Sequence, residues 1–250
     1  MTRPSSAAGR LARYGFTDVI AAGALLDADG LGLWDAANQA PMDPAARDVL
    51  VTLGGAADPD LALRQFHRLA ESTQRSAARA AAPADPAPTA RPMEELIAAV
   101  RRDAVVRSRL AAVLGASTAL GDDLVANPDR WGWLALPIDE DDLFAGAQPA
   151  TAPQLRDAYR SALLRIAADD LTGVTEVEQT MRRLAALADA TMAAALRLAE
   201  SERGATARLA VIAMGKCGGR ELNYVSDVDV IFVCATDEDL AHAQPIAARA

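Results

Sequence analysis

Two long stretches with helical periodicity dominate the second half of the sequence. The first runs from Thr151 or Pro153 to Leu171, and the second runs from Thr175 to about Glu202. In the second stretch apolar or small residues recur every three or four positions, as a helix with one buried face requires: Val177, Met181, Leu184, Ala188, Thr191, Ala195 and Leu198. Only a short turn at Gly173 separates the two stretches, so the pattern predicts an antiparallel pair of helices.

Charged residues also lie along the first helix of this pair. They are Arg160, Arg165, Asp169 and Asp170. Such side chains are mostly solvated in soluble proteins, so we predict that they form the exposed face of the helix. Contact with a charged ligand is the alternative, and the sequence does not require it.

The composition favours helices in the rest of the chain as well. Hydrophobic residues make up 51% of the 250 residues but aromatic residues only 4%, so alanine supplies much of the apolar content. Alanine has the highest helix propensity, and its helices must pack closely because each buried methyl group contributes little. We therefore predict an α+β fold, in which a mostly helical amino-terminal region leads into a smaller α/β domain.

Capping residues and prolines divide the first part of the chain into short helices. Thr17 can cap a helix that starts at Asp18, Pro44 can open one that reaches residue 53, and Asp58 with the following proline can open one that reaches residue 80. Prolines are too frequent over residues 81–92 for a helix or a central strand. That segment is predicted to be a linker.

Helical periodicity returns after the linker. A helix is predicted from Met93 to Gly115, and Ser117 can cap the next one, which should end at Asn127 because a proline follows. Trp131 and Trp133 are interpreted as anchors between neighbouring helices.

Charge and hydropathy limit the partners of the chain. Its net charge is −9 and no run of lysine or arginine is present, so we predict no nucleic-acid partner. Aspartates interrupt the apolar segment Ala21–Leu33, no other run is long enough to span a bilayer, and no signal peptide is recognisable. The two cysteines, Cys217 and Cys234, form no CxxC pair and are expected to be reduced. We therefore expect a cytoplasmic protein with no membrane partner.

The pattern changes sharply after Arg208. Residues 209–214, Leu-Ala-Val-Ile-Ala-Met, form a short apolar run typical of a strand buried on both faces. After a turn that contains glycines, Val228 and residues 230–233 form a second run of β-branched and aromatic residues, and a helix is expected from Asp237. Three regions are therefore predicted: a helical region over 1–92, a second helical region over 93–205, and the start of an incomplete α/β domain over 206–250.

Residues 213–233, AMGKCGGRELNYVSDVDVIFV, carry the candidate chemistry. Side chains two positions apart in a strand point to the same side, so Asp227 and Asp229 would present two carboxylates together while Val228 faces the core. Neighbouring carboxylates repel each other unless a cation lies between them, and Mg²⁺ prefers oxygen ligands of this kind. An unpaired charge inside an apolar run would also be costly, which favours a metal site.

Other residues of this segment suit a phosphate group. Gly218 and Gly219 leave room for a close backbone approach, and a short helix predicted over Arg220–Tyr224 would direct its amides at an anion. Ser226 adds a hydroxyl donor beside the first aspartate. A strand, a glycine pair, a short helix and two spaced aspartates, in this order, predict metal-dependent phosphoryl or nucleotidyl transfer.

Each part of this pattern taken alone has an explanation that needs no ligand. An isolated Asp-Val-Asp commonly caps a turn at a strand end, and an isolated glycine pair is equally unspecific. Lys216 and Glu221 can contact a substrate or form a structural ion pair, and both alternatives stay open. Cys217 and Cys234 are interpreted as core residues. The joint occurrence of these features favours the metal site.

The stretch GKCGGRELNYVSDVDVIF, residues 215–232, resembles the motif GKLGGxELNxxSDxDLIF of the glutamine synthetase adenylyltransferase family, within the superfamily of DNA polymerase β-like nucleotidyltransferases. It departs from that motif at Cys217 and Val230, where the family usually has leucine and an apolar residue is kept. The resemblance covers residues 93–233 well and residues 1–92 loosely.

This resemblance implies a bifunctional regulatory enzyme. Family members carry two nucleotidyltransferase domains: an amino-terminal one that removes AMP from a tyrosine of glutamine synthetase by phosphorolysis, and a carboxy-terminal one that adds AMP from ATP. Asn223 matches the amino-terminal version, because the other domain tends to have glycine there. The implied partners are glutamine synthetase and a nitrogen-signalling PII protein.

By the same resemblance, Asp227 and Asp229 are the catalytic residues and hold Mg²⁺, with Mn²⁺ as an alternative. Orthophosphate would then attack the phosphorus of the AMP group and release ADP. The predicted phosphate- and nucleotide-binding set is Lys216, Gly218, Gly219, Asn223 and Ser226.

The third metal-binding carboxylate of the superfamily lies on a later strand, and nothing after Phe232 resembles it. The chain is therefore expected to be a fragment with little or no turnover of its own. Two alternatives remain: a nucleotidyltransferase with a different acceptor, such as a regulatory protein or a small molecule, and a helical interaction module that binds glutamine synthetase without modifying it.

Overall fold

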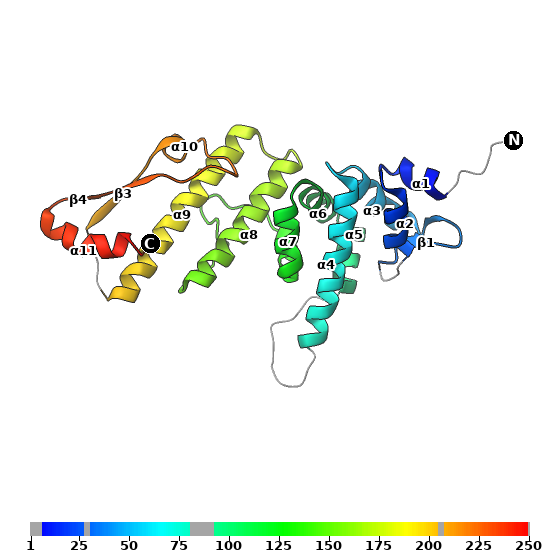
Figure 1. Ribbon diagram of the computed structural model, residues 1–250, viewed down its shortest axis with the longest axis horizontal. Helices are drawn as coiled ribbons and strands as arrows, with labels where there is room; N and C mark the ends of the chain where they lie inside the picture. The colour runs from blue at the N-terminus through cyan, green and yellow to red at the C-terminus, as the bar shows by residue number, and fades with distance from the viewer. Residues whose placement is uncertain (1–6, 28–30, 81–92, 205–207, 250) are drawn as a thin grey trace. The chain divides into compact units, whose positions relative to one another are not determined.

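The computed structural model of the chain describes residues 7–27, 31–80, 93–204 and 208–249 (Figure 1). They form two compact units, Met1–Leu136 and Pro137–Ala250. We predicted boundaries after residues 92 and 205, but the division falls inside the predicted middle region, because helices after residue 92 pack against helices before the predicted linker. The linker itself, residues 81–92, lies outside the described residues.

The amino-terminal unit is a helical assembly around one long helix, α4. Its helices are α1 (Ala7–Arg13), α2 (Val19–Asp27), α3 (Pro44–Gly54), α4 (Pro59–Ala80), α5 (Met93–Arg102), α6 (Ala104–Ala116), α7 (Thr118–Ala126) and the 3₁₀ helix η1 (Pro128–Ala135). A small antiparallel sheet joins β1 (Trp34–Asp35) to β2 (Ala40–Pro41). Helix α4 packs against α2, α3, α5, α6, α7 and η1, and it buries Leu63, Phe66 and Leu69 in the core of the unit.

Side-chain caps explain where several helices of this unit begin. The carboxylate of Asp43 accepts a hydrogen bond from the amide of Ala46 at 2.8 Å at the start of α3, and Asp58 caps α4 in the same way. Ser117 caps α7, which ends before Asn127. These helix boundaries are confirmed, and so is the burial of Trp131 among the helices, whereas Trp133 is half-buried.

Two predicted helix boundaries in this unit are wrong. The helix predicted over Met93–Gly115 is divided at Asp103, whose carboxylate accepts hydrogen bonds from the second and third amides that follow it and so starts α6. Asp18, and not Thr17, caps α2, because its carboxylate accepts from the third amide after it at 3.0 Å. Thr17 is bonded instead to Asp60 of α4.

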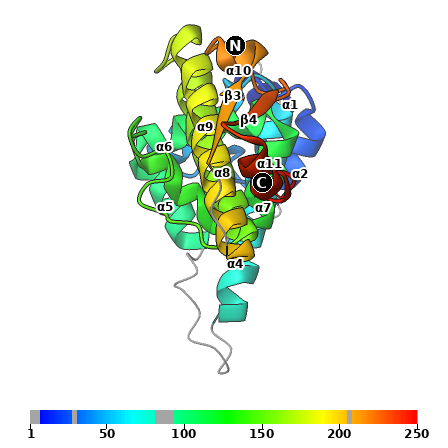
Figure 2. The same ribbon diagram turned by 90° about the vertical axis from the view of Figure 1, so that its left-hand side faces the viewer.

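The carboxy-terminal unit combines a helical pair with a β-hairpin. Helices α8 (Ala152–Leu171) and α9 (Val177–Arg203) pack against each other on either side of Gly173 and run in opposite directions in Figure 1, which confirms the predicted pair. They are followed by β3 (Leu209–Ala213), α10 (Gly215–Gly218), β4 (Val230–Cys234) and α11 (Asp237–Ala247). β3 and β4 are antiparallel, with Ala213 opposite Val230. Figure 2 shows this hairpin beside α9.

Two of the charged residues predicted to be solvated are buried instead. Arg165 and Asp169 of α8 are each 4% exposed. Arg165 donates to the carbonyl oxygens of Pro137, at 3.3 Å, and of Leu143, both in the loop before α8. Asp169 accepts from Arg183 of α9 at 3.1 Å. The prediction is wrong for these two residues because their partners come from other segments, which the periodicity of one helix does not show.

The buried face of α9 also differs from the predicted stripe. Leu184 is buried as predicted, but Val177 is exposed and the remaining members of the stripe are half-buried. Helix α9 contacts α8, α10 and α11, so its buried residues do not lie in one stripe. They include Leu184, Ala185, Leu187, Ala194 and Ala199.

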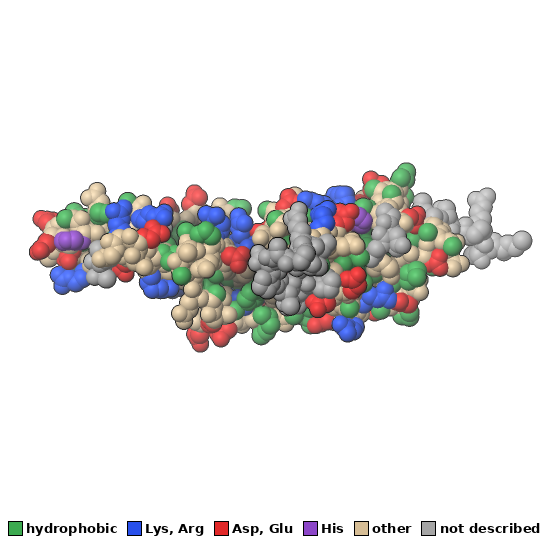
Figure 3. All heavy atoms as spheres, turned by 90° about the horizontal axis from the view of Figure 1, so that it is seen from below, with side chains coloured by type: hydrophobic (Ala, Val, Ile, Leu, Met, Phe, Trp, Pro, Cys, Tyr) green, Lys and Arg blue, Asp and Glu red, His purple; other side chains and the backbone are tan. Residues whose placement is uncertain are grey.

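None of the described helices is both long and apolar enough to cross a membrane. On the face of the molecule drawn in Figure 3, basic and acidic side chains are interspersed. Opposite charges that alternate in this way suit a surface in contact with water.

Candidate functional site

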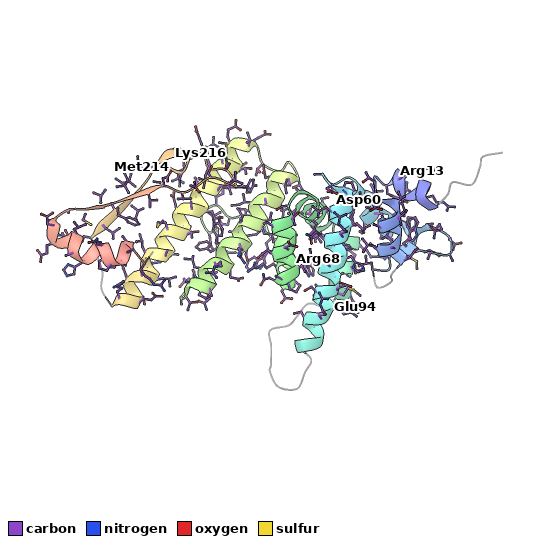
Figure 4. The ribbon with its side chains drawn as sticks, in the orientation of Figure 1. Arg13, Asp60, Arg68, Glu94, Met214 and Lys216 are labelled. Atoms are coloured by element: carbon purple, nitrogen blue, oxygen red, sulfur yellow. The ribbon has the colours of Figure 1, made fainter. Side chains whose placement is uncertain are left out.

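The β3–β4 hairpin carries the candidate site, and only one of its faces is covered. Side chains alternate along both strands, so that Leu209, Val211 and Val230 line a cavity shared with α9, while Ile212 and Ile231 are 47% and 48% exposed. The prediction that the first strand is buried on both faces is wrong for this structure. An apolar run indicates that a segment forms a strand, but it does not show how many faces of that strand are packed. Met214, labelled at the end of β3 in Figure 4, belongs to the open face.

The two predicted metal ligands lie directly before β4. The Met214 amide donates to the Asp229 carbonyl oxygen at 2.8 Å, which extends the strand pairing by one residue and places Asp229 on the open face. Alternation places Asp227 on the same side, whereas Val228 lines the cavity against α9. The predicted proximity of the two carboxylates is therefore consistent with the backbone.

Both carboxylates are exposed, which corrects one premise of the prediction. We expected unpaired charges inside an apolar strand, but Asp227 and Asp229 precede the strand and face solvent. Among the described residues, neither side chain forms a hydrogen bond or an ion pair. Two uncommitted oxygen donors suit Mg²⁺ or Mn²⁺, which take carboxylate ligands and complete their coordination with water. No third His, Cys, Asp or Glu joins them into a metal-binding cluster within the described part of the chain.

The segment that contains the glycine pair begins with a short helix that we did not predict. Residues 215–218 make the short helix α10, and the Gly218 amide donates to the Met214 carbonyl at 3.0 Å. The helix predicted over Arg220–Tyr224 is absent from this segment, because Arg220 has a left-handed backbone with φ of 59° and ends the turn. The helix thus ends at the first glycine of the pair instead of following the pair. No helix amides are therefore available to face an anion over residues 220–224.

Gly218 and Gly219 have different structural roles. A Cβ atom at Gly218 would lie 2.3 Å from the carbonyl oxygen of Ala213 in β3, so only glycine fits against the strand. A Cβ atom at Gly219 would lie 3.4 Å from its nearest neighbour, the carbonyl oxygen of Gly215, which is an ordinary contact. Gly218 is therefore explained by packing alone, whereas Gly219 leaves the backbone open.

This difference predicts opposite outcomes for two matched substitutions. Gly218→Ala should lower the free energy of unfolding by about 1–3 kcal/mol, because the backbone of β3 must move. Gly219→Ala should change it by less than about 0.5 kcal/mol. Urea unfolding followed by circular dichroism measures both. Equal stabilities of the two variants would contradict the close packing of Gly218 on β3.

A hydrogen-bonded turn precedes the carboxylates. The Oδ1 atom of Asn223 accepts from the Val225 amide at 3.1 Å and from the Ser226 hydroxyl at 2.8 Å. The Ser226 amide also donates to the Asn223 carbonyl at 3.3 Å. Asn223 therefore builds the turn that leads to Asp227. The Ser226 hydroxyl proton, predicted to face phosphate, points to Asn223 in this arrangement.

Lys216 and Glu221 are joined through the backbone only. The Glu221 amide donates to the Lys216 carbonyl at 2.8 Å. Both side chains are exposed, and neither forms an ion pair among the described residues. Lys216, labelled in Figure 4, is thus an available cation on α10.

Cys217 is a core residue, as predicted. It is 3% exposed and packs in a cluster with Leu184, Leu187 and Leu222. Burial, assisted by the nearby charge of Asp189, raises the pKa of the Cys217 thiol and keeps it protonated. Cys234 is half-buried on β4, and neither cysteine is bonded to the other.

Sequence reasoning missed Tyr224. Its hydroxyl donates to Asp170 Oδ2 of α8 at 2.9 Å. Partial burial, and then the hydrogen bond and the charge of Asp170, raise the pKa of Tyr224 well above its ordinary value, so the phenol remains a donor. The two residues are 54 positions apart, and no local pattern in the sequence links them.

Comparison with known proteins identifies relatives of this chain. A sequence model of the glutamate–ammonia ligase adenylyltransferase family matches residues 145–249, a segment that includes the paired carboxylates. The bifunctional glutamine synthetase adenylyltransferase/adenylyl-removing enzyme of Streptomyces coelicolor is 46% identical over 242 residues, which cover 92% of this chain and 22% of that protein. The enzyme of the same name from Streptomyces avermitilis is 44% identical over 92% of this chain and 22% of that protein. The enzyme of the same name from Mycobacterium marinum is 38% identical over 100% of this chain and 24% of that protein. No solved structure matches.

These matches place the chain in a family whose members are named adenylyltransferases. More narrowly, it belongs to the glutamate–ammonia ligase adenylyltransferase family. The chain spans about a fifth of the length of the relatives from the two Streptomyces species.

Proposed function

We propose that this chain supplies the carboxylate-bearing edge of a site that removes AMP from a tyrosine of glutamine synthetase, in a protein that also adds AMP. The observation that carries the proposal is the pair of exposed, uncommitted carboxylates, Asp227 and Asp229, within the segment that matches the family. Carboxylates with a purely structural role would form an ion pair with a neighbouring cation or cap a helix or turn. Neither is found for them among the described residues.

The residues of the site have distinct tasks in this proposal. Asp227 and Asp229 would hold Mg²⁺ or Mn²⁺, which when bound would neutralise charge on the phosphate oxygens. Lys216 would add positive charge from α10, and the open backbone at Gly219 would let a phosphate approach closely. Asn223 and Ser226 would fix the turn that holds the carboxylates in place.

The proposed reaction is phosphorolysis. An oxygen of orthophosphate attacks the AMP phosphorus, the bond from that phosphorus to the tyrosine oxygen breaks, and the proton of the phosphate passes to the tyrosine. The products are ADP and the unmodified tyrosine. The reverse modification would use ATP at another site of the full-length protein, and regulation by a PII protein in the cytoplasm is part of the same proposal.

A chimeric enzyme tests this function. The matching segment of the Streptomyces coelicolor relative, which is 46% identical, would be replaced by this chain. We expect the chimera to release AMP groups from adenylylated glutamine synthetase as ADP in the presence of phosphate and Mg²⁺. The double variant Asp227→Asn, Asp229→Asn should lose this activity by at least about 100-fold.

Addition of AMP from ATP by the same chimera serves as the internal control, and it should persist in the double variant. Full removal activity in the double variant would exclude the two aspartates from the site. Loss of both activities in the double variant would instead indicate a folding defect, which circular dichroism of the chimera detects.

A further inference from the structure

The segment that carries the carboxylates has little backbone support of its own. Among the described residues, the backbone hydrogen bond from Ser226 to Asn223, at 3.3 Å, is the only one with both ends in residues 222–228. Val225 in the middle of the segment is 91% exposed. The position of the segment therefore depends on side chains that reach the helical pair.

Every second residue from Arg220 to Tyr224 makes a contact of this kind. Arg220 forms an ion pair with Asp189 of α9 at 2.9 Å, but both side chains are about half exposed, so this pair contributes little. Leu222 is 6% exposed and packs in the core cluster with residues of α8 and α9. The Tyr224 hydroxyl donates to Asp170 at the end of α8. Tyr224 is the last of these anchors before the carboxylates.

Asp170 is itself held in place from its other side. Its Oδ1 atom accepts from the Thr180 hydroxyl of α9 at 3.0 Å, while its Oδ2 atom accepts from Tyr224 at 2.9 Å. Thr180 is buried, and its hydroxyl lies 3.0 Å from that of Thr175, which is also buried. A carboxylate bonded through both oxygens to two different elements has one preferred orientation. The orientation of Asp170 therefore fixes where the Tyr224 ring can lie.

We infer that the Tyr224–Asp170 hydrogen bond, backed by Thr180, fixes the position of Asp227 and Asp229 relative to the α8–α9 pair. The inference rests on the proposed function for the metal that these carboxylates would hold. Tyr224 and Asp170 are positioning residues, since neither reaches the carboxylates directly. The consequence is that the helical pair sets the geometry of the site, although it contributes no ligand to it.

The test compares the unchanged chain with Tyr224→Phe, Asp170→Asn and the two combined. Mn²⁺ alone is titrated by calorimetry at a temperature at which circular dichroism shows each variant to be folded. We expect each single variant to weaken Mn²⁺ binding by about fivefold, and the double variant to be no weaker than either, because one shared interaction is removed. Tyr159→Phe on α8 is the matched control, since no hydrogen bond of the Tyr159 hydroxyl is found within the described ranges.

Amide hydrogen exchange provides a second readout that needs no metal. Exchange of the Val225 and Ser226 amides, which are hydrogen-bonded to Asn223, should become several-fold faster in Tyr224→Phe, while the β3 amides, which belong to the strand ladder, stay unchanged. Unchanged exchange of the Val225 and Ser226 amides overturns the inference. So does unchanged Mn²⁺ affinity in a chain that binds Mn²⁺. If the unchanged chain binds no Mn²⁺, the metal site of the proposed function fails, and the exchange result alone decides the positioning role.

Discussion

A chain in which Asp227 and Asp229 are both replaced by asparagine is expected to bind Mn²⁺ at least about tenfold more weakly than the unchanged chain. The substitution removes two negative charges and keeps the size of both side chains. Because both residues are exposed and have no partner among the described residues, the fold should not depend on them. Calorimetric titration with Mn²⁺, with and without ADP, measures the difference.

The chain contains a matched control for this experiment. Asp139 and Asp141 are also two positions apart and exposed, but they lie in the loop before α8, where Asp139 Oδ1 accepts from the Asp141 amide at 3.0 Å. Replacing both by asparagine changes the net charge equally and should leave Mn²⁺ affinity unchanged. If the two double variants lose affinity to the same extent, binding is due to overall charge and the site is wrongly placed.

Helices with local boundary signals could be predicted from the sequence. Asp43 and Asp58 cap helices that begin with proline, and Gly173 separates the α8–α9 pair, so each signal lies within a few residues of the boundary that it sets. The break at Asp103 was missed, because apolar residues continue on both sides of it and only the cap shows that a new helix starts.

Burial could not be predicted in the same way. Arg165 and Asp169 are buried because a loop and a neighbouring helix supply their partners, and Ile212 is exposed because only one face of the β-hairpin is packed. In each case the deciding neighbour is distant in sequence. Local pattern determines which element forms, whereas long-range packing determines which of its faces is covered.

The candidate site shows the same division. The spacing of Asp227 and Asp229 and the glycine turn were evident in the sequence, and the family resemblance of the segment that contains them is confirmed. The sequence did not show that Tyr224 and Asp170 support this segment. The two residues joined by that hydrogen bond are separated in the chain by α9, β3 and α10. Motifs report residues close in sequence, and the contacts that position a motif are usually not among them.

Replacing Gly54 by alanine is expected to destabilise the amino-terminal unit by about 3 kcal/mol or more. In an ordinary helix position the same change is favourable by up to about 1 kcal/mol, because alanine has the higher helix propensity. Here a Cβ atom would lie 1.5 Å from the carbonyl oxygen of Tyr14 and 2.6 Å from its carbon. The sign of the effect should therefore reverse.

The surroundings of Gly54 leave little room for relaxation. The contacting atoms belong to the backbone at the end of α1, where the Tyr14 amide donates to the Leu11 carbonyl at 3.0 Å. The approach is mutual, because a Cβ atom at Gly15 would lie 2.3 Å from the Gly54 carbonyl oxygen. The Tyr14 ring also packs edge-on against Trp34, with 6.4 Å between ring centroids. Moving the backbone at Tyr14 would disturb both contacts.

Tryptophan fluorescence measures this effect selectively, because all three tryptophans, Trp34, Trp131 and Trp133, belong to the amino-terminal unit. Urea unfolding of Gly54→Ala should show a lower midpoint with an unchanged slope. Gly23→Ala in α2 is the control, since its Cβ atom would meet only the Leu11 Cδ1 atom at 3.6 Å. It should be neutral or slightly stabilising. Equal midpoints for the two variants would mean that the ends of α1 and α3 are not in backbone contact in solution.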